Sequence, residues 1–465
     1  MHTQILPSPH SHTQPHAHHQ DDISTNLFAP LQLGSTFELS HRVVLAPVTR
    51  CRALHYVPQP AHVRFYSERT THGGLLITEA TAICQQGIGF PHSPGIWSEE
   101  QVQAWHKVVE AVHNKGGYIF CQLWHVGRAS HTYYQPDEEL SLPVSSTSKR
   151  VPISWSVRLP EGAMAEYSKP RALLTHEIPT VVQQFRQAAQ NAKRAGFDGV
   201  EIHGAHGYLI DQFLKDGIND RDDEYGGSVE NRCRFALEVV EAVAAEIGEG
   251  HTAIRISPII DHLGATDSNP RALALHLISR LNEKNLAYLH VTEPRFTNQG
   301  LRPSSEDHCH DDLLPLFRKA FKGKVMLSGG FDRTSGMDTI RRGAADLISY
   351  GRLYISNPDL PLRFAIKAGL NAYDRSTFYT HDQVKGYLDY SRLSPDEVEQ
   401  GWARRHESSS STAAASTAVA EKEERKKRLL RVHISSKCGP AAGSASSALL
   451  PSSPATPIAA GSPRP

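Results

Sequence analysis

The stretch VMLSGGFDRTSGMDTIRRGAADLISYGR, residues 325–352, contains one full copy of the unit that decides the fold. It opens with a mainly apolar run at 325–329 and closes with a second one at 347–351. Runs of this kind are typical of strands buried on both faces of a parallel sheet. Between them lies a segment that ends at Gly343, a residue type favoured just after a helix. The stretch therefore predicts a strand, a helix and a parallel strand.

The same unit recurs along the chain. Eight short apolar runs occupy residues 43–47, 74–80, 118–125, 199–204, 253–257, 288–293, 325–329 and 347–351. Amphipathic stretches at 99–114, 180–195, 229–247, 270–283 and 311–320 separate many of them, and Gly116 and Gly196 follow two of these helices. Repetition of strand and helix eight times over about 330 residues predicts an α/β fold, a closed (β/α)8 TIM barrel.

An open, doubly wound sheet is the competing architecture. Its dinucleotide-binding form requires the pattern G-x-G-x-x-G after the first strand. Residues 48–53, which follow the first run, read VTRCRA and contain no glycine, and no phosphate-binding P-loop pattern occurs. The barrel is therefore the preferred prediction.

Composition excludes several classes of function. The 465 residues include 49 Lys+Arg and 49 Asp+Glu, so no basic field favours nucleic acid. No apolar run is long enough to span a membrane, and no secretory leader pattern opens the chain. Six scattered cysteines without a C-x-x-C pair fit a reducing compartment. We expect a cytoplasmic protein, with a plastid location as the alternative.

The domain prediction is a single barrel over residues 23–400. A His/Pro-rich leader (1–22) and a low-complexity tail (404–465) have too few large apolar residues to fold, and both are expected to be disordered. The leader could alternatively bind metal through its histidines. Residues 126–176 are too many for an ordinary loop and are predicted to cap the barrel mouth.

Two glycine-rich corners predict an anion site. Ser328-Gly329-Gly330 and Tyr350-Gly351-Arg352 end the last two predicted strands, and a helix follows each. Backbone N–H groups at such corners commonly bind phosphate in TIM barrels, and an arginine can grip it with two donors. Alternatively, the glycines only permit tight turns.

The sequence His203-Gly204-Ala205-His206-Gly207-Tyr208 leaves the fourth predicted strand. Two imidazoles at this spacing are compatible with three interpretations. They could bind a metal together with Asp211, or they could be structural. They could also donate hydrogen bonds to one substrate oxygen, with Tyr208 as a nearby proton donor.

These residues lie within motifs that resemble the old yellow enzymes, a family of NADH:flavin oxidoreductases. The motifs are VLAPVTR (44–50), CQLWHVGR (121–128), HGAHGYLIDQFL (203–214) and YGRLYISNPDLP (350–361). The resemblance covers about residues 27–390 in family order, and the tails have no match. The His203/His206 pair is similar to the 12-oxophytodienoate reductase branch, because yeast-type members carry His and Asn there.

The resemblance implies a binding site for flavin mononucleotide (FMN). The residues that would line the ring are Pro47, Val48, Thr49, Ala80, Gln122 and Arg255, and those that would hold the phosphate are Gly329, Gly330, Gly351 and Arg352. At Ala80 the family often has glycine. The implied substrate residues are His203 and His206 for an oxygen atom, Tyr208 for the proton, and Trp124, Tyr354, Phe378, Tyr379 and Arg295 as neighbours.

The implied activity is reduction of the C=C bond of an α,β-unsaturated carbonyl, with NADPH or NADH as reductant. Hydride would pass from flavin N5 to the β-carbon, while His203 and His206 receive charge on the oxygen and Tyr208 protonates the α-carbon. One rival is a phosphate-binding barrel aldolase or isomerase, which would need a lysine or a carboxylate base such as Glu201 or Glu293 at a strand end. Another is a non-catalytic flavin-binding scaffold. The enone itself, and the choice between monomer and homodimer, stay open.

Overall fold

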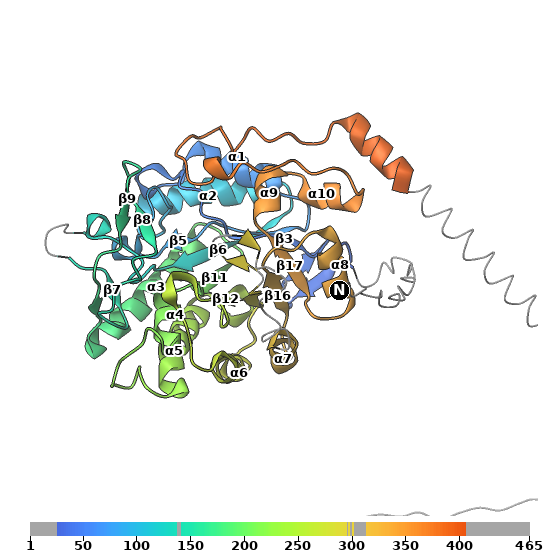
Figure 1. The fold of residues 1–465 in the computed structure, drawn as a ribbon. Helices are drawn as coiled ribbons and strands as arrows, with labels where there is room; N and C mark the ends of the chain where they lie inside the picture. Colours follow the sequence, from blue (N-terminus) through green and yellow to red (C-terminus); the bar gives the residue numbers. More distant parts are fainter. Residues whose placement is uncertain (1–25, 137–140, 295, 298–299, 302–312, 406–465) are drawn as a thin grey trace, which may run out of the picture. The chain divides into compact units, whose positions relative to one another are not determined.

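The computed structural model describes residues 26–136, 141–294, 296–297, 300–301 and 313–405. Its frame is a closed barrel of eight parallel strands (Figure 1). In order around the barrel these are β11 (Gly199–Gly204), β12 (Thr252–Ile256), β13 (Leu289–Thr292), β16 (Val325–Ser328), β17 (Leu347–Tyr350), β3 (Val43–Leu45), β4 (Leu75–Ile77) and β6 (Tyr118–Trp124). Pairing of β6 with β11 closes the ring. The predicted barrel is confirmed strand by strand.

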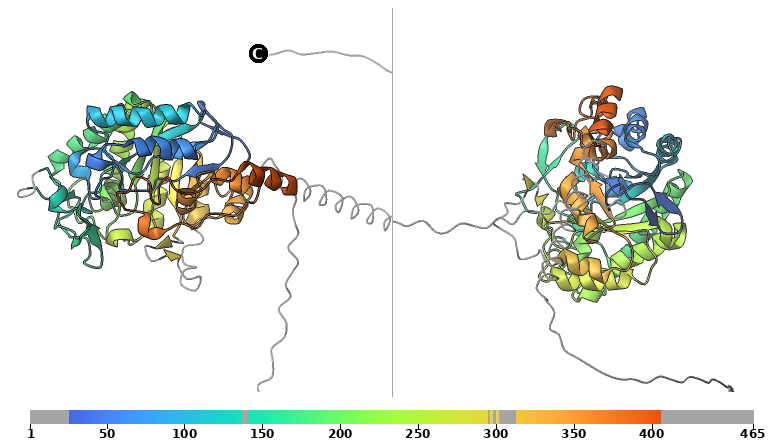
Figure 2. Two further views of the ribbon diagram at one scale, coloured as in Figure 1. Left: turned by 90° about the horizontal axis from the view of Figure 1, so that it is seen from above. Right: turned by 90° about the vertical axis from the view of Figure 1, so that its right-hand side faces the viewer.

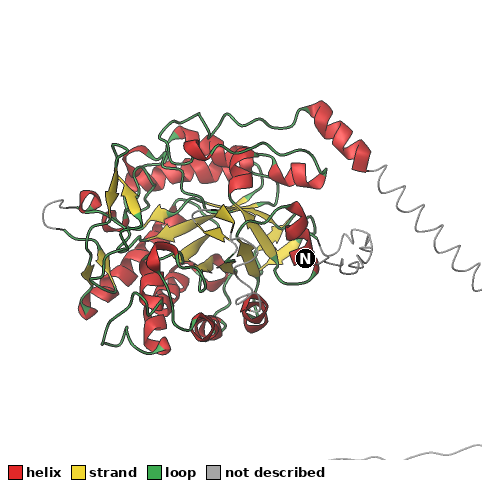
Figure 3. Ribbon diagram, in the orientation of Figure 1, coloured by secondary structure: helices red, strands yellow, loops and turns green. Residues whose placement is uncertain are grey.

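Helices surround the strands (Figure 3). The longer ones are α1 (Pro60–Arg69), α2 (Glu99–His113), α3 (Ile178–Arg194), α5 (Val229–Ile247), α6 (Pro270–Leu281), α7 (Leu313–Ala320) and α8 (Arg333–Arg341). Shorter helices are α4 (Leu209–Leu214), α9 (Arg352–Ser356) and α10 (Leu360–Ala365). The glycines expected after helices take the left-handed conformation, with φ of 69° at Gly116, 90° at Gly196 and 68° at Gly343. These helix-end predictions are confirmed.

The sequence analysis missed α1, which packs beside α2 (Figure 2). Its buried residues are His62, Phe65, Tyr66 and Arg69. Their spacing is that of one helix face, but two of the four are polar types that a hydrophobic pattern does not count. Counting apolar residues alone therefore does not detect the buried face of α1.

A β-hairpin that the sequence analysis also missed lies at the amino end of the barrel. It consists of β1 (Leu31–Leu33) and β2 (Phe37–Leu39), paired antiparallel. The ring of Phe37 contacts Tyr118, Phe120 and His251 at centroid distances of 5.3, 5.6 and 5.3 Å. The hairpin thus covers the end of the barrel where the strands begin.

The described part of the 126–176 excursion lies at the opposite, carboxyl end. It contains the short strands β7 (Val144–Ser145), β8 (Ser156–Arg158), β9 (Met164–Glu166) and β10 (Arg171–Ala172). Figure 1 shows β8 and β9 beside β5 (Thr81–Ala82), a short strand that pairs with β6. Val157 and Tyr167 of the excursion share one buried cluster with Ala80, Trp124 and Tyr208.

The predicted leader, residues 1–22, lies outside the described residues. The predicted tail, 404–465, also lies outside them except for Arg404 and Arg405. Of the helices described, none has the length and apolarity that a bilayer crossing requires.

We predict that stability falls in mild acid because of a buried histidine that joins β3 to the α1–β4 loop. His41 Nε2 lies 2.7 Å from Thr71 Oγ1, Nδ1 accepts from the Val43 N–H at 3.3 Å, and burial lowers the pKa of His41 to about 4. Below about pH 6.5 the imidazole is therefore protonated in the unfolded chain but not in the folded chain. The free energy of unfolding then falls by up to about 1.4 kcal/mol for each pH unit.

Urea unfolding at about pH 7 and about pH 5 tests this linkage. We expect the parent to lose about 1–2 kcal/mol more than His41→Gln over this interval, because glutamine does not titrate. His176→Gln, at an exposed position, is the matched control and should follow the parent. Equal losses for the parent and His41→Gln would show that His41 does not contribute.

Candidate functional site

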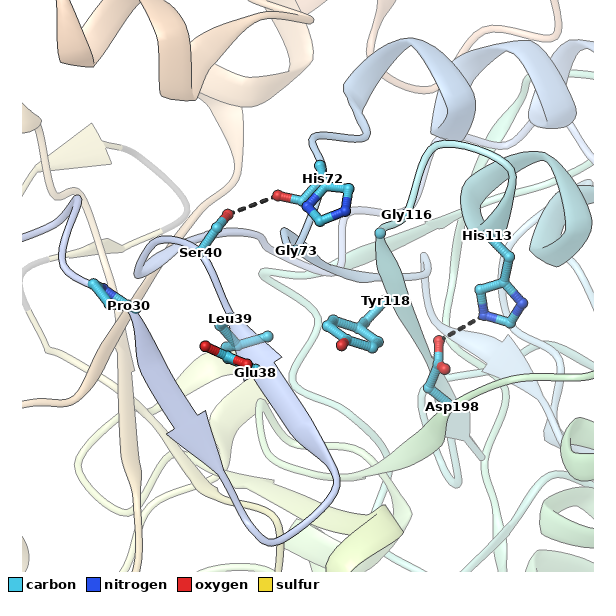
Figure 4. Close-up of a pocket in the computed structure, with 11 residues that line it drawn as sticks. Pro30, Glu38, Leu39, Ser40, His72, Gly73, His113, Gly116, Tyr118 and Asp198 are labelled. Atoms are coloured by element: carbon cyan, nitrogen blue, oxygen red, sulfur yellow. Dashed lines mark hydrogen bonds and ion pairs between the residues drawn. The ribbon is translucent and has the colours of Figure 1, made fainter.

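The predicted site residues come from the carboxyl ends of the barrel strands. Parallel strands share one direction, so these ends form a single rim. A cavity of about 780 Å³ lies elsewhere, at the amino end, where Glu38, His72 and His113 line it (Figure 4). There His113 Nε2 points to Asp198 Oδ2 at 2.9 Å (Figure 4). That cavity is separate from the candidate site.

A strained turn places His206 beside His203. After β11 the chain passes through His206 at φ 58° and Gly207 at φ 74°, two left-handed residues in succession. Such a conformation is costly for a residue with a side chain and persists where neighbours hold it. The His206 N–H donates to Ser257 Oγ at 2.8 Å, and the Gly207 N–H donates to Asp211 Oδ2 at 2.8 Å. The turn places the His206 ring 5.4 Å from that of His203, nearly perpendicular to it.

The metal interpretation of this pair loses its third ligand. Asp211 Oδ2 lies 3.0 Å from Lys215 Nζ and also accepts from Gly207. Both charged side chains are buried, so each satisfies the other. Within the described parts of the chain, no three His, Cys, Asp or Glu side chains are grouped so that they could hold a metal.

Burial sets the protonation of the three central side chains. Desolvation, followed by the charge of Arg255, lowers the pKa of both His203 and His206 well below the usual histidine value. Both imidazoles are therefore neutral near pH 7. Desolvation also raises the pKa of Tyr208 well above its usual value, so its phenol keeps its proton. The Tyr208 ring lies 5.1 Å from that of His203. The arrangement offers neutral donors and one weak acid.

Aromatic rings line one side of these groups. The ring centroid of Trp124 lies 5.0 Å from that of Tyr208 and 5.6 Å from that of Phe90. The centroids of Phe90 and Tyr379 are 6.4 Å apart. Tyr379 is 46% exposed and Phe378 contacts it. The sequence analysis missed Phe90, because an aromatic residue in a loop belongs to no periodic pattern.

Two buried arginines hold the segment that carries Tyr379. Arg50 Nε donates to the Phe378 carbonyl at 3.2 Å, and Arg52 Nη2 donates to the Lys385 carbonyl at 2.9 Å. Both guanidinium side chains are fully buried. These bonds attach a late segment of the chain to the loop that follows β3.

The structure does not bring every predicted substrate residue to this place. Tyr354 is 2% exposed in the helix layer, where its hydroxyl donates to the Arg69 carbonyl at 3.1 Å. Arg295 lies outside the described residues. The predicted contacts of Tyr354 and Arg295 with substrate therefore have no support from the described geometry.

The rim residues predicted for the cofactor follow one another around the barrel. Pro47, Val48 and Thr49 continue β3 and are partly exposed. A side chain on Gly351, after β17, would meet Val48 Cγ1 at 3.1 Å, so these two strand ends are neighbours. Ala80, after β4, is buried with Trp124 and Tyr208.

The corner after β16 favours glycine. Gly329 has φ 125° and Gly330 has φ 83°, and a Cβ on Gly329 would lie 3.0 Å from the Glu293 carbonyl oxygen. Arg352 is half-buried at the start of α9, with Nη1 3.4 Å from the Tyr373 hydroxyl. The two corners follow the neighbouring strands β16 and β17, and backbone and guanidinium donors at such corners are the groups that bind anions.

The guanidinium group of Arg255 lies at the mouth of the barrel and donates hydrogen bonds to two hydroxyl groups. Its Nε donates to Thr292 Oγ1 at 3.2 Å, and its Nη2 donates to Ser328 Oγ at 3.0 Å. Its side chain is buried, and burial lowers its pKa, although arginine stays charged at neutral pH. A fixed cation at this point favours negative charge on a bound ring.

A series of buried, hydrogen-bonded side chains near Arg255 was not predicted from the sequence. Gln122 Nε2 donates to Glu201 Oε1 at 2.7 Å, Glu201 Oε2 lies 2.9 Å from His290 Nδ1, and His290 Nε2 lies 3.0 Å from Ser349 Oγ. Burial acts to raise the pKa of Glu201, but His290 and Arg255 outweigh it and lower the pKa. Glu201 is thus an engaged carboxylate, which removes it as the base of an aldolase or isomerase.

Two buried polar atoms at the mouth are candidates for contact with a ligand. His203 Nδ1 and Trp124 Nε1 are buried and have no hydrogen-bond partner among the described residues. Buried polar atoms nearly always bond something, so these two atoms point to a polar ligand or water in the mouth.

Comparison with known proteins gives a consistent result. The model of the NADH:flavin oxidoreductase / NADH oxidase family matches residues 26–372. The chain is 56% identical over 375 residues to 12-oxophytodienoate reductase 7 of Oryza sativa subsp. japonica, covering 79% of this chain and 94% of that one. It is 50% identical over 370 residues to 12-oxophytodienoate reductase 2 of Arabidopsis thaliana, covering 80% and 96%. The solved structure of morphinone reductase superposes with a TM-score of 0.75 at 42% identity, covering 80% and 98%.

We predict that Gly329→Ala destabilises the protein more than Gly343→Ala does. Both positions have positive φ, but Gly343 has open space around the added methyl group, whereas Gly329 has the Glu293 backbone within 3.2 Å. We expect losses of about 3 kcal/mol at Gly329 and about 1 kcal/mol at Gly343 in urea unfolding. Equal losses would mean that the corner after β16 can relax and is not built for glycine.

Proposed function

This chain belongs to the NADH:flavin oxidoreductase / NADH oxidase family, and from that premise we propose that it is an FMN-dependent ene-reductase. Its reaction would use a reduced nicotinamide nucleotide to saturate the C=C bond of an α,β-unsaturated carbonyl compound. This chain covers 94% and 96% of the length of two relatives named 12-oxophytodienoate reductase, which supports that substrate class.

One observation carries the proposal. Two neutral imidazoles and a protonated phenol converge at the rim that also holds Arg255 and the glycine corners. Hydrogen-bond donors without charge can receive negative charge that develops on a carbonyl oxygen, and a weak acid beside them can deliver the matching proton.

The residues present fit the cofactor. Thr49, Gln122 and Arg255 would hold the ring, while the corners at Gly329-Gly330 and Gly351-Arg352 would hold the phosphate. FMN, when bound, supplies hydride that it has received from the nicotinamide nucleotide.

The chain's own residues complete the reduction. His203 and His206 donate hydrogen bonds to the carbonyl oxygen, which makes the β-carbon electron-poor enough to accept hydride; each donor of such a site is worth on the order of 10²–10³ in rate. Tyr208 then gives its proton to the α-carbon, a step worth about 10²–10⁴. The alkene thus gains one hydride and one proton, and the carbonyl is restored.

We further propose NADPH as the reductant and 12-oxophytodienoate or a related enone as the substrate. The names of the relatives support this choice of enone. The solved complex of morphinone reductase with tetrahydroNAD, 43% identical to this chain, shows a nicotinamide analogue bound to a protein of this fold.

For Tyr208→Phe we predict normal reduction of the bound flavin by NADPH but enone turnover slowed by about 10²-fold or more, because only the second half of the cycle uses the proton. Anaerobic stopped-flow absorbance measures the two halves separately. A parent protein that binds FMN but is not reduced by NADPH would be a scaffold, and one that cannot bind FMN would refute the proposed function. Parent-like enone turnover in the variant would exclude Tyr208 as the acid.

For the double variant His203→Ala/His206→Ala we predict a loss of about 100-fold in affinity for a simple phenol, since each lost hydrogen bond costs about tenfold. The phenol oxygen stands in for the substrate oxygen, and titration of the flavin absorbance reports binding. His113→Gln, at the other end of the barrel, is the control and should bind phenol like the parent. Unchanged affinity in the double variant would exclude the pair as the oxygen site.

A further inference from the structure

Thr292, at the end of β13, connects two groups that the proposed function assigns to different partners. Its hydroxyl oxygen lies 3.2 Å from Nε of Arg255, which would face the cofactor, and 3.1 Å from Nε2 of His206, which would face the substrate. The residue is 7% exposed, so water competes little for these contacts.

A second hydroxyl completes the arrangement. Ser328 Oγ accepts from Nη2 of Arg255 at 3.0 Å and donates its own hydrogen to Thr292 Oγ1 at 3.3 Å. One guanidinium therefore orients both hydroxyl groups, and the second hydroxyl passes its hydrogen to the first.

Counting hydrogens then fixes the direction of the last bond. A hydroxyl group can accept two hydrogen bonds and donate one. Arginine has only donors, so both acceptor positions of Thr292 are taken, one by Arg255 and one by Ser328. The single hydrogen of Thr292 is left for His206 Nε2.

A neutral imidazole carries one N–H, so accepting at Nε2 leaves the hydrogen on Nδ1. We propose that Thr292 sets the tautomer of His206, so that its Nδ1–H is the donor offered to the substrate oxygen. Thr292 is thus a positioning residue that acts through His206; this inference rests on the proposed function of the site.

The two histidines are then not equivalent. The tautomer of His206 is fixed by the hydrogen bonds that run from Arg255 through Thr292. Nδ1 of His203, in contrast, is buried without a hydrogen-bond partner among the described residues. Loss of the Thr292 hydroxyl should therefore affect substrate binding only where His206 is present. The same hydrogen bonds connect the proposed substrate donor to the Arg255 cation.

Phenol affinity of FMN-loaded Thr292→Val tests the proposal, because valine keeps the shape and removes the hydroxyl. We expect a loss of about tenfold, as for one hydrogen bond. Thr292→Ser restores the hydroxyl and should bind phenol within about twofold of the parent.

Two further variants separate the tautomer from general damage. Ser328→Ala tests the hydrogen count, because it frees one acceptor position of Thr292 and no longer restricts His206 to one tautomer; we expect a loss of phenol affinity between about twofold and tenfold. In a His206→Ala background, Thr292→Val should cause no additional loss. A loss for Thr292→Val that persists in that background would overturn the proposal, as would parent-like binding by Thr292→Val itself.

Nitrogen-15 NMR of the histidine-labelled full chain reads the tautomer directly, with or without enone turnover. His206→Ala identifies the His206 signals. We expect Nε2 to be the unprotonated nitrogen in the parent and in Thr292→Ser, and a mixture of tautomers in Thr292→Val. Protonated Nε2 in the parent would overturn the inference while leaving an ene-reductase intact, whereas failure of the parent to bind FMN or reduce enones would overturn the proposed function alone.

Discussion

The pairing of β6 with β11 is the constraint on which the rest of the structure depends. It aligns Gln122 with Glu201 and closes the ring, so strands that are far apart in the sequence end at one rim. Because all eight strands run the same way, Val48, His203, Arg255 and the glycine corners meet there without any long-range sequence signal. A barrel left open at this pair would have an edge strand and no common mouth.

Within that rim, burial rather than distance decides the chemistry. Desolvation keeps His203 and His206 neutral and keeps the proton on Tyr208, while Arg255 remains a cation held by two hydroxyl groups. The mouth thus holds one fixed positive charge, and neutral donors lie close to it. A more hydrated mouth with the same residues would lose this division, because water would stabilise protonated imidazoles.

The sequence predicted the elements that apolar periodicity or glycine reports: the eight barrel strands, most long helices and the glycine corners. It did not predict the hairpin β1–β2, whose strands have three residues each, or α1, whose buried face includes His62 and Arg69. It also missed Thr292 and the chain from Gln122 to Ser349, because side-chain hydrogen bonds across a barrel leave no trace in the spacing of one sequence. The roles given to Thr49, Gln122 and the wall residues stay predictions.

The arginine anchors have a consequence for how the protein is made. Arg50 and Arg52 bond carbonyl groups that follow them by 328 and 333 residues, so these guanidinium groups gain those acceptors only when nearly the whole described chain has left the ribosome. A buried cation without such partners costs several kcal/mol. The first loop of the barrel therefore gains its full set of hydrogen bonds only after residue 385 has been synthesised.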